Sequence, residues 1–350
     1  MTQEKTRESN IELLRILSMV YIVLYHFFLH GLKKTSPELE YLIKPIISVL
    51  HIGVICFVLI SGYWGIKFSL KGFAKLFLQC SFYSVIIYLV YGLITPEHFS
   101  FKELANALLP FQWWYIQIYL CLYLLSPIVN LPLQTNDAQK KLVYIGILAV
   151  ISMLLGHFIP SLSDGKNPVN FILIYYIGNF IRHHLKHPSK KIVGYYILFN
   201  LVVFFSLFAT SSLPVYRNWL YDTLFFPYNS IGLFINAVLF FLCFETFSFK
   251  SKFINWIAIS ILPVYLLHEN QYLSHYLYDF VKRAKETIDL PILFGLFLLV
   301  LAMAVILAGV LIDKLLSPVY KALEIAVTKS SFFEKLDSQV HQILAKKDKA

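Results

Sequence analysis

Charged residues are scarce in this chain. Asp, Glu, Lys and Arg together make up 14% of its 350 residues, whereas 58% are hydrophobic. Soluble globular proteins contain about 25% charged and about 45–50% apolar residues. The shortage of charge therefore excludes a soluble enzyme. At about 20 residues per crossing, the chain has room for some ten membrane spans and no sizeable water-soluble domain.

Cysteine is also rare, and its placement excludes two further classes. The four cysteines, Cys56, Cys80, Cys121 and Cys243, lie inside apolar runs without CxxC or Cys/His spacing, so neither a disulfide framework nor a zinc motif is indicated. We expect them to be small core residues. The net charge of +10 fits cytoplasmic loops that face anionic membrane lipid, and no nucleic-acid partner is predicted.

Apolar windows predict an all-α, polytopic membrane protein with about ten transmembrane helices in one bundle. The first window contains Arg15 and lacks a small-residue cleavage site, so we expect it to be a retained helix. The predicted division is a tail at 1–10, a membrane domain at 11–313 and a tail at 314–350. The windows are 11–30, 45–65, 73–94, 113–131, 142–160, 169–181, 192–210, 230–248, 254–274 and 292–313.

Basic residues predict the orientation. With ten spans and both termini in the cytoplasm, 20 Lys and Arg lie inside and 9 outside, in agreement with the positive-inside rule. The window 169–181 has only 13 residues. If it did not cross, the same count would give 11 inside and 18 outside, so we expect it to cross. We expect a multi-pass protein of the plasma membrane with cytoplasmic ends.

Arg15 and His26 are the most unusual residues of the first window, because ionisable side chains inside a membrane span are costly. Eleven residues of helix turn only ~20° beyond three full turns and rise ~16.5 Å. One face of this helix thus links the inner leaflet to the outer half of the bilayer. A simpler interpretation is that Arg15 reaches the headgroups and His26 is a hydrogen-bonded core histidine.

Further polar residues interrupt the later windows. Glu245 lies in the eighth, and His268 and Glu269 lie in the ninth at about the same depth as His26. We predict that His268 and Glu269 are a second acid/base pair or an orienting pair; the alternative is a hydrogen-bonded pair at the outer end of the ninth helix. His26 and His30 have the i, i+4 spacing of metal ligands, but no third ligand is tied to them, and no metal is expected.

A basic segment follows the second window. Lys67, Lys71 and Lys75 recur every four residues, which on a helix would form one edge suited to phosphate groups. Ordinary positive-inside lysines are the simpler interpretation. Ser61 precedes them in a Ser-Gly-Tyr-Trp-Gly segment, where the backbone could approach a ligand or the helix could end.

Four segments together resemble the acyltransferase-3 family of integral membrane acyltransferases. The first window has the family's Arg or Lys, ten residues and then His. The other three resemble, in order, its second-helix Ser-Gly signature, its fourth span and its late Tyr-Leu-x-His segment. They are CFVLISGY (56–63), WYIQIYLCLYLLSP (114–127) and LPVYLLH (262–268).

The resemblance implies O-acylation, usually O-acetylation, of carbohydrate at the cell surface. Acetyl-CoA or another acyl-CoA would be the donor substrate, and a polysaccharide or lipid-linked sugar the acceptor. It also implies that Arg15 and His26 are the essential pair. Some relatives carry an additional extracytoplasmic esterase-like domain, whereas here only 37 residues follow Asp313. We therefore expect transfer within the bundle or with a separate polysaccharide-assembly protein.

The combined hypothesis is a membrane acyltransferase. Arg15, Ser61 and the three lysines would hold the donor, and His26 would act as general base or carry the acyl group itself. A glycolipid transporter or flippase is the main alternative, since it would also need Arg and His within the membrane. A structural subunit of a polysaccharide-export complex is a third, and it predicts no dependence on His26.

Overall fold

The computed structural model describes residues 8–32, 39–185 and 187–347, which form helices and connecting turns without a β-strand. The fold is all-α, as predicted. Residues 1–7 and 348–350 of the two predicted tails lie outside the described residues. The α-helices are α1 (Ser9–His26), α2 (Glu40–Leu50), α3 (Gly53–Trp64), α4 (Leu70–Ile94), α5 (Phe101–Ala107), α6 (Trp114–Val129), α7 (Ala138–Ala149), α8 (Gly156–Phe158), α9 (Pro168–His184), α10 (Lys191–Ala209), α11 (Pro214–Leu220), α12 (Ile231–Glu245), α13 (Lys252–Ala258), α14 (Ile261–His268), α15 (Ser274–Thr287), α16 (Pro291–Thr328) and α17 (Ser331–Lys347).

Several helical segments have the length and apolar composition needed to span a bilayer, so this is a multi-pass membrane protein. Among the described residues there are six, and each falls on a predicted window. Shorter apolar helices, α6, α12 and the α13–α14 pair, fall on three more windows. The remaining window, 169–181, coincides with α9, and the count of ten crossings stays a prediction. The six are Ser9–Leu32, Glu40–Trp64, Leu70–Ile94, Ala138–Leu155, Lys191–Ser212 and Pro291–Thr328.

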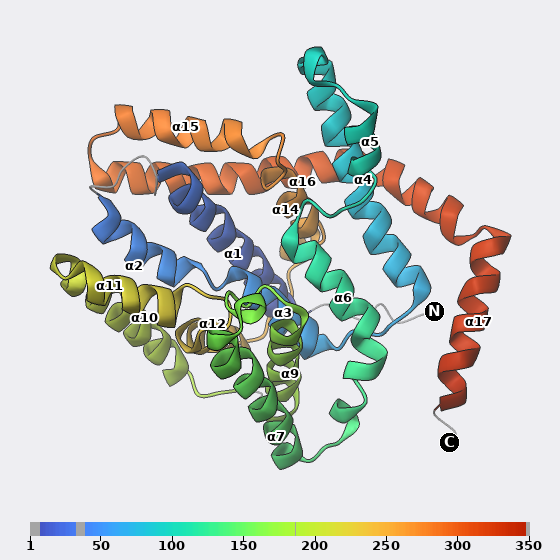
Figure 1. Cartoon of the computed structure of the whole chain (residues 1–350), viewed down its shortest axis with the longest axis horizontal. Coiled ribbons are helices and arrows are strands. Elements are labelled where there is room, and N and C mark those ends of the chain that lie inside the picture. The colour runs from blue at the N-terminus through green and yellow to red at the C-terminus, as the bar shows by residue number, and fades with distance from the viewer. Residues whose placement is uncertain (1–7, 33–38, 186, 348–350) are drawn as a thin grey trace.

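Helix α1 runs through the middle of the bundle (Figure 1). It contains neither Gly nor Pro, and it packs against α3, α12, α13, α14 and α16. Its first turn is tied to distant segments, because the Asn10 side-chain amide donates to the Phe244 carbonyl at 2.9 Å and the Ser251 backbone N–H donates to Ser9 Oγ at 2.8 Å. These contacts fix the register of α1 against α12 and α13.

The closest helix pair is α3 with α9. A Cβ on Gly62 would lie 2.0 Å from the Tyr175 carbonyl oxygen, and one on Gly178 would lie 2.3 Å from that of Leu59. Small residues allow such backbone contact between membrane helices. Gly65, with a φ of 75°, then ends α3. The Ser-Gly segment therefore serves helix packing through Gly62 and helix termination through Gly65.

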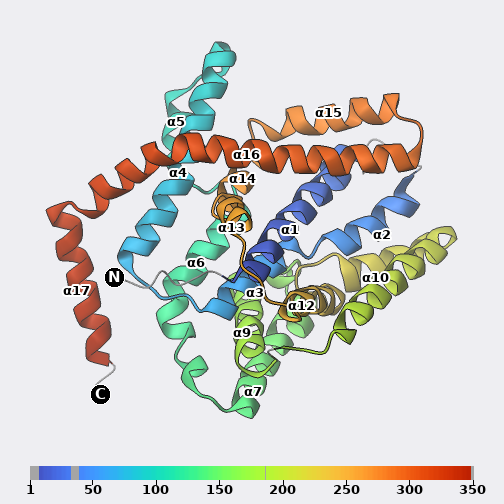
Figure 2. The ribbon, with the colours of Figure 1, turned by 180° about the vertical axis from the view of Figure 1, so that it is seen from behind.

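A break at Ile259–Ser260 separates α13 from α14, which lie one after the other in the view from behind (Figure 2). The carboxylate of Asp313 on α16 holds this break. It is 1% exposed and accepts hydrogen bonds from Ser260 Oγ at 2.5 Å, Tyr83 OH at 2.8 Å and Tyr320 OH at 3.4 Å. The start of α14 is thereby fixed to α4 and α16.

The cysteines are free thiols, and three of them are buried as expected: Cys56, Cys80 and Cys243. The prediction of a core position is wrong for Cys121, which is exposed. It lies on α6, where Leu124, Leu125 and Ile128 are exposed as well. An apolar helix side that faces the bilayer tolerates a thiol as readily as a packed core does.

Candidate active site

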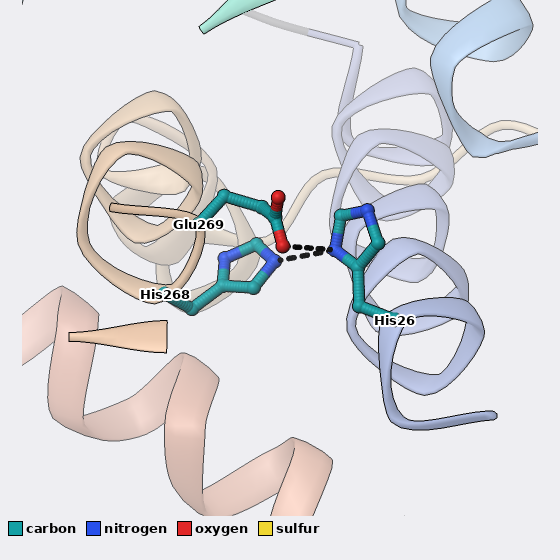
Figure 3. Close-up of side chains that lie close together, drawn as sticks. All are labelled: His26, His268 and Glu269. Atoms are coloured by element: carbon teal, nitrogen blue, oxygen red, sulfur yellow. Dashed lines mark hydrogen bonds and ion pairs between the residues drawn. The ribbon is translucent and has the colours of Figure 1, made fainter. Parts of the chain in front are cut away.

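Three of the predicted site residues meet where α1 and α14 end. His26 is the last residue of α1, His268 is the last of α14, and Glu269 follows directly. His26 Nδ1 lies 3.2 Å from His268 Nε2 and 3.2 Å from Glu269 Oε1 (Figure 3). The sequence placed these residues at one depth, and the fold brings them into direct contact across 242 residues of chain.

The hydrogen bonds determine which nitrogen of each imidazole carries a proton. His268 Nδ1 lies 2.8 Å from the Val264 carbonyl oxygen, which can only accept, so this nitrogen donates and His268 Nε2 keeps a lone pair. His26 Nδ1 must then donate, with His268 Nε2 and the Glu269 carboxylate as acceptors. His26 Nε2, which points away from both partners in Figure 3, is left with its lone pair.

Tyr278 completes the cluster. Its hydroxyl donates to Glu269 Oε1, the same oxygen that faces His26, and its ring lies 5.2 Å from that of His30. Helix α15, which carries Tyr278, packs on the π-helical turn Phe27–Leu32 that follows His26. Tyr278 gave no signal in the sequence, because it is one of 23 tyrosines and lies outside the predicted windows.

Two neighbouring cavities lie along α1. The larger has a volume of about 170 Å³, and Arg15 and Ser61 are among its lining residues. A smaller cavity of about 10 Å³ is lined by His26 and His51, and both cavities share Ile22, Val54 and Tyr265 in their walls. Arg15 and His26 thus line neighbouring cavities that share three wall residues.

Arg15 and Ser61 both have polar partners beside this cavity. Arg15 Nε lies 3.3 Å from Glu12 Oε2, one turn earlier on α1. Ser61 Oγ lies 3.1 Å from Tyr119 OH on α6. The Arg15 side chain is 31% exposed, whereas that of Glu12 is 7% exposed.

The three lysines do not form the single helical edge that their spacing predicted. Helix α4 begins at Leu70, so Lys67 precedes it in a non-helical segment. Lys75 Nζ lies 2.6 Å from Glu324 Oε1 and Lys71 Nζ lies 4.0 Å from Asp337 Oδ2. Carboxylates of α16 and α17 therefore already face two of the lysines. Lys67 is exposed.

Glu245 does not join the His26 cluster. It is 4% exposed and ends α12, near Tyr63 and Arg182 and close to the first turn of α1. His26, His268 and Glu269 carry donor atoms within 4.8 Å of one another, a spacing that the ligands of one metal ion can also have. Hydrogen bonds account for the 3.2 Å separations without a metal, and the expectation that none is used stays a prediction.

Comparison with known families gives one result. A family model described as an acyltransferase domain, of the acyltransferase-3 type, matches residues 8–311. The match includes α1, the α13–α14 pair and every residue of the His26 cluster. Among curated proteins and solved structures, none matches the chain.

Proposed function

We propose a function from the premise that this chain belongs to the acyltransferase-3 family of integral membrane acyltransferases. It moves an acyl group, most simply acetyl, from cytoplasmic acyl-CoA to a hydroxyl group. The acceptor hydroxyl belongs to a cell-surface or lipid-linked polysaccharide. One observation carries the proposal. His26 Nδ1 is held by Glu269 and His268, so that His26 Nε2 is available as a base beside the cavity system that begins at Arg15.

The chemistry requires a base at the acceptor hydroxyl. As the sugar oxygen attacks the thioester carbonyl, its proton moves to His26 Nε2, and the Glu269 carboxylate balances the imidazolium. The carbon–sulfur bond then breaks. The same proton passes to the departing thiolate, which leaves an ester and free CoA. In the alternative route, His26 Nε2 attacks the thioester first, the carbon–sulfur bond breaks and CoA leaves as the thiolate. The sugar oxygen then attacks the acyl-imidazole, the nitrogen–acyl bond breaks, and the hydroxyl proton ends on the thiolate.

The cavity supports a path for the donor. In this proposal the charged nucleotide of acyl-CoA stays in the cytoplasm, where Arg15 and Lys67 meet its phosphates, because guanidinium and ammonium groups bind phosphate well. The thioester arm enters the cavity, which is lined mainly by apolar side chains such as Met19, Phe57 and Leu262. Lys71 and Lys75 would have to exchange their carboxylate partners to take part.

The direct test is mass spectrometry of surface glycans and their lipid-linked precursors from cells with and without the gene. We expect the loss of one acyl mass from a sugar in the deletion strain, with its return on complementation. A transporter would instead leave acylation intact and change the distribution of the glycan across the membrane. Unchanged acyl content in the deletion strain would contradict the proposal.

Arg15 provides a test of donor binding. Loss of a charge-assisted contact of about 1.5–3 kcal/mol predicts that Arg15→Ala raises the dissociation constant for acyl-CoA about 10- to 150-fold. Arg15→Lys should have a smaller effect because it keeps the charge. Since Arg15→Ala also removes a cation that lies 3.3 Å from Glu12, Arg15→Ala with Glu12→Gln is the control. Unchanged acyl-CoA binding by the purified double variant would remove Arg15 from the donor site.

The proposed orientation can be tested with two exposed serines. Ser212 lies in a loop predicted outside, and Ser248 is the last residue of the predicted window 230–248, at the end predicted to face the cytoplasm. In a Cys121→Ser background, Ser212→Cys should react with a membrane-impermeant thiol reagent in intact cells, while Ser248→Cys should react only after permeabilisation. The reverse pattern would contradict cytoplasmic termini.

A further inference from the structure

A cavity with several polar lining residues lies beside the loop that follows Glu269. Its volume is about 300 Å³, within the range of ~300–1,000 Å³ that is typical of small-molecule sites. None of its lining residues is basic, within the described part of the chain, and the functional groups that face it are a carboxylate, amides and hydroxyls. The polar lining consists of Ser84, Glu103, Asn106, Gln112, Gln271 and Tyr272.

Hydrogen bonds join one wall of this cavity to the 269–272 loop, which begins at Glu269. The side-chain amide of Gln112 donates to Ser84 Oγ at 2.7 Å, and its oxygen accepts from Asn270 Nδ2 at 3.1 Å. Asn270 is fully buried and follows Glu269 directly. Asn270 Oδ1 also accepts from the Tyr272 backbone N–H at 2.9 Å. A ligand in this cavity would therefore lie against the loop that holds Glu269 toward His26.

The cavity also presents a fixed aromatic ring. The centroid of Tyr272 lies 5.1 Å from that of Tyr88 and 4.9 Å from that of Tyr91, both on α4. Ring contacts of this kind hold Tyr272 in place. Amides and a carboxylate can pair with several hydroxyls at once, while an aromatic face suits the apolar side of a sugar ring. This combination is the chemistry that recognises a sugar.

We propose that this cavity binds the sugar that accepts the acyl group, and that the sugar is neutral or amino-bearing. The inference rests on the proposed function and its orientation, which put α5 and the 269–272 loop at the outer face. Glu103 would repel an acidic sugar, and no lining cation offsets it. Leu109 and Phe111, which also line the cavity, are about half exposed, so the site adjoins apolar surface and can receive the sugar of a lipid-linked precursor or the end of a polymer.

Chemical modification of a cysteine introduced into the cavity tests the site, whichever sugar it binds. In cells with a Cys121→Ser background, Asn106→Cys is treated with a bulky, impermeant maleimide, and the cells are then pulsed with labelled acetate. Label is measured in lipid-extractable glycan and in polymer. Ala105→Cys is the matched control, because Ala105 is the exposed neighbour on α5 that does not line the cavity.

We expect the reagent to lower incorporation in Asn106→Cys to less than about a tenth of the untreated value, a difference of about 1.4 kcal/mol, and to leave Ala105→Cys unchanged. Early label in the lipid extract would identify a lipid-linked acceptor, and label in polymer alone a polymeric one. A cysteine at 106 that does not react, or that reacts without loss of incorporation, overturns the inference. So does an acyl group found only on acidic sugars. If untreated cells incorporate no label into glycan at all, the proposed function itself fails, and this result differs from every outcome that concerns the cavity alone.

Discussion

Replacement of His26 by glutamine or alanine is expected to abolish acyl transfer, with a rate loss of about 10²–10⁴-fold, while expression and acyl-CoA binding persist. Glutamine keeps the size of the side chain and one hydrogen-bonding end, but it cannot accept a proton at pH 7. If His26 were only a structural core histidine, His26→Gln should be mild. The measurement is CoA release by purified protein in the presence of acceptor.

His275→Gln is the matched control for this experiment. His275 is exposed on α15, about one helical turn before Tyr278. We expect acyl transfer to proceed without its imidazole. Residual transfer above about a tenth of wild type in a folded His26→Gln protein would contradict the catalytic role. Metal analysis of the same preparations adds a second criterion. If the wild-type protein contained stoichiometric zinc and His26→Gln lost it, His26 would be a metal ligand and the general-base assignment would be wrong.

The second large effect is expected at Glu269. Glu269→Gln keeps the shape of the side chain but removes the charge that balances the His26 imidazolium. We expect kcat to fall about 10²-fold, with the dissociation constant of acyl-CoA unchanged. The loss should be smaller than at His26, because His268 Nε2 still accepts from His26 Nδ1 and preserves its tautomer.

The rate loss of Tyr278→Phe provides a comparison for that of Glu269→Gln. It removes one hydrogen bond to Glu269, which is worth about 0.5–1.5 kcal/mol, so the rate should fall only about 2- to 12-fold. The expected order of rate loss is therefore His26→Gln, Glu269→Gln and then Tyr278→Phe. A Glu269→Gln protein that turns over at the wild-type rate would exclude the carboxylate from the reaction.

The sequence predicted the main members of this cluster because a polar residue inside an apolar run is a strong signal. His26, His268 and Glu269 stand out in this way, and the rise per residue placed them at one depth. Depth alone does not say which helices are neighbours. Contact between α1 and α14 depends on tertiary packing, including the Asp313 network that fixes the break before Ile261.

Periodicity failed where the backbone departs from a regular helix. The four-residue spacing of the lysines predicted one edge. The segment 61–65 did indicate that a helix could end there, as α3 does at Gly65, but the sequence could not reveal that α4 begins only at Leu70. Nor could it show that Glu324 and Asp337, far along the chain, face Lys75 and Lys71. The acyltransferase-3 motifs in the sequence indicated the family, and the match over residues 8–311 confirms it.

The Glu12–Arg15 pair has a consequence for how the protein enters the membrane. His26 is synthesised 242 residues before His268, which at about 5–20 residues per second means a delay of roughly 10–50 s. During this time α1 lacks α14, which it contacts in the folded protein. Glu12 and Arg15 lie three residues apart on the same helix, so their charges can neutralise each other without any other segment. The first helix can therefore enter the lipid with the Arg15 guanidinium already paired. It can remain there until α14 is synthesised and inserted.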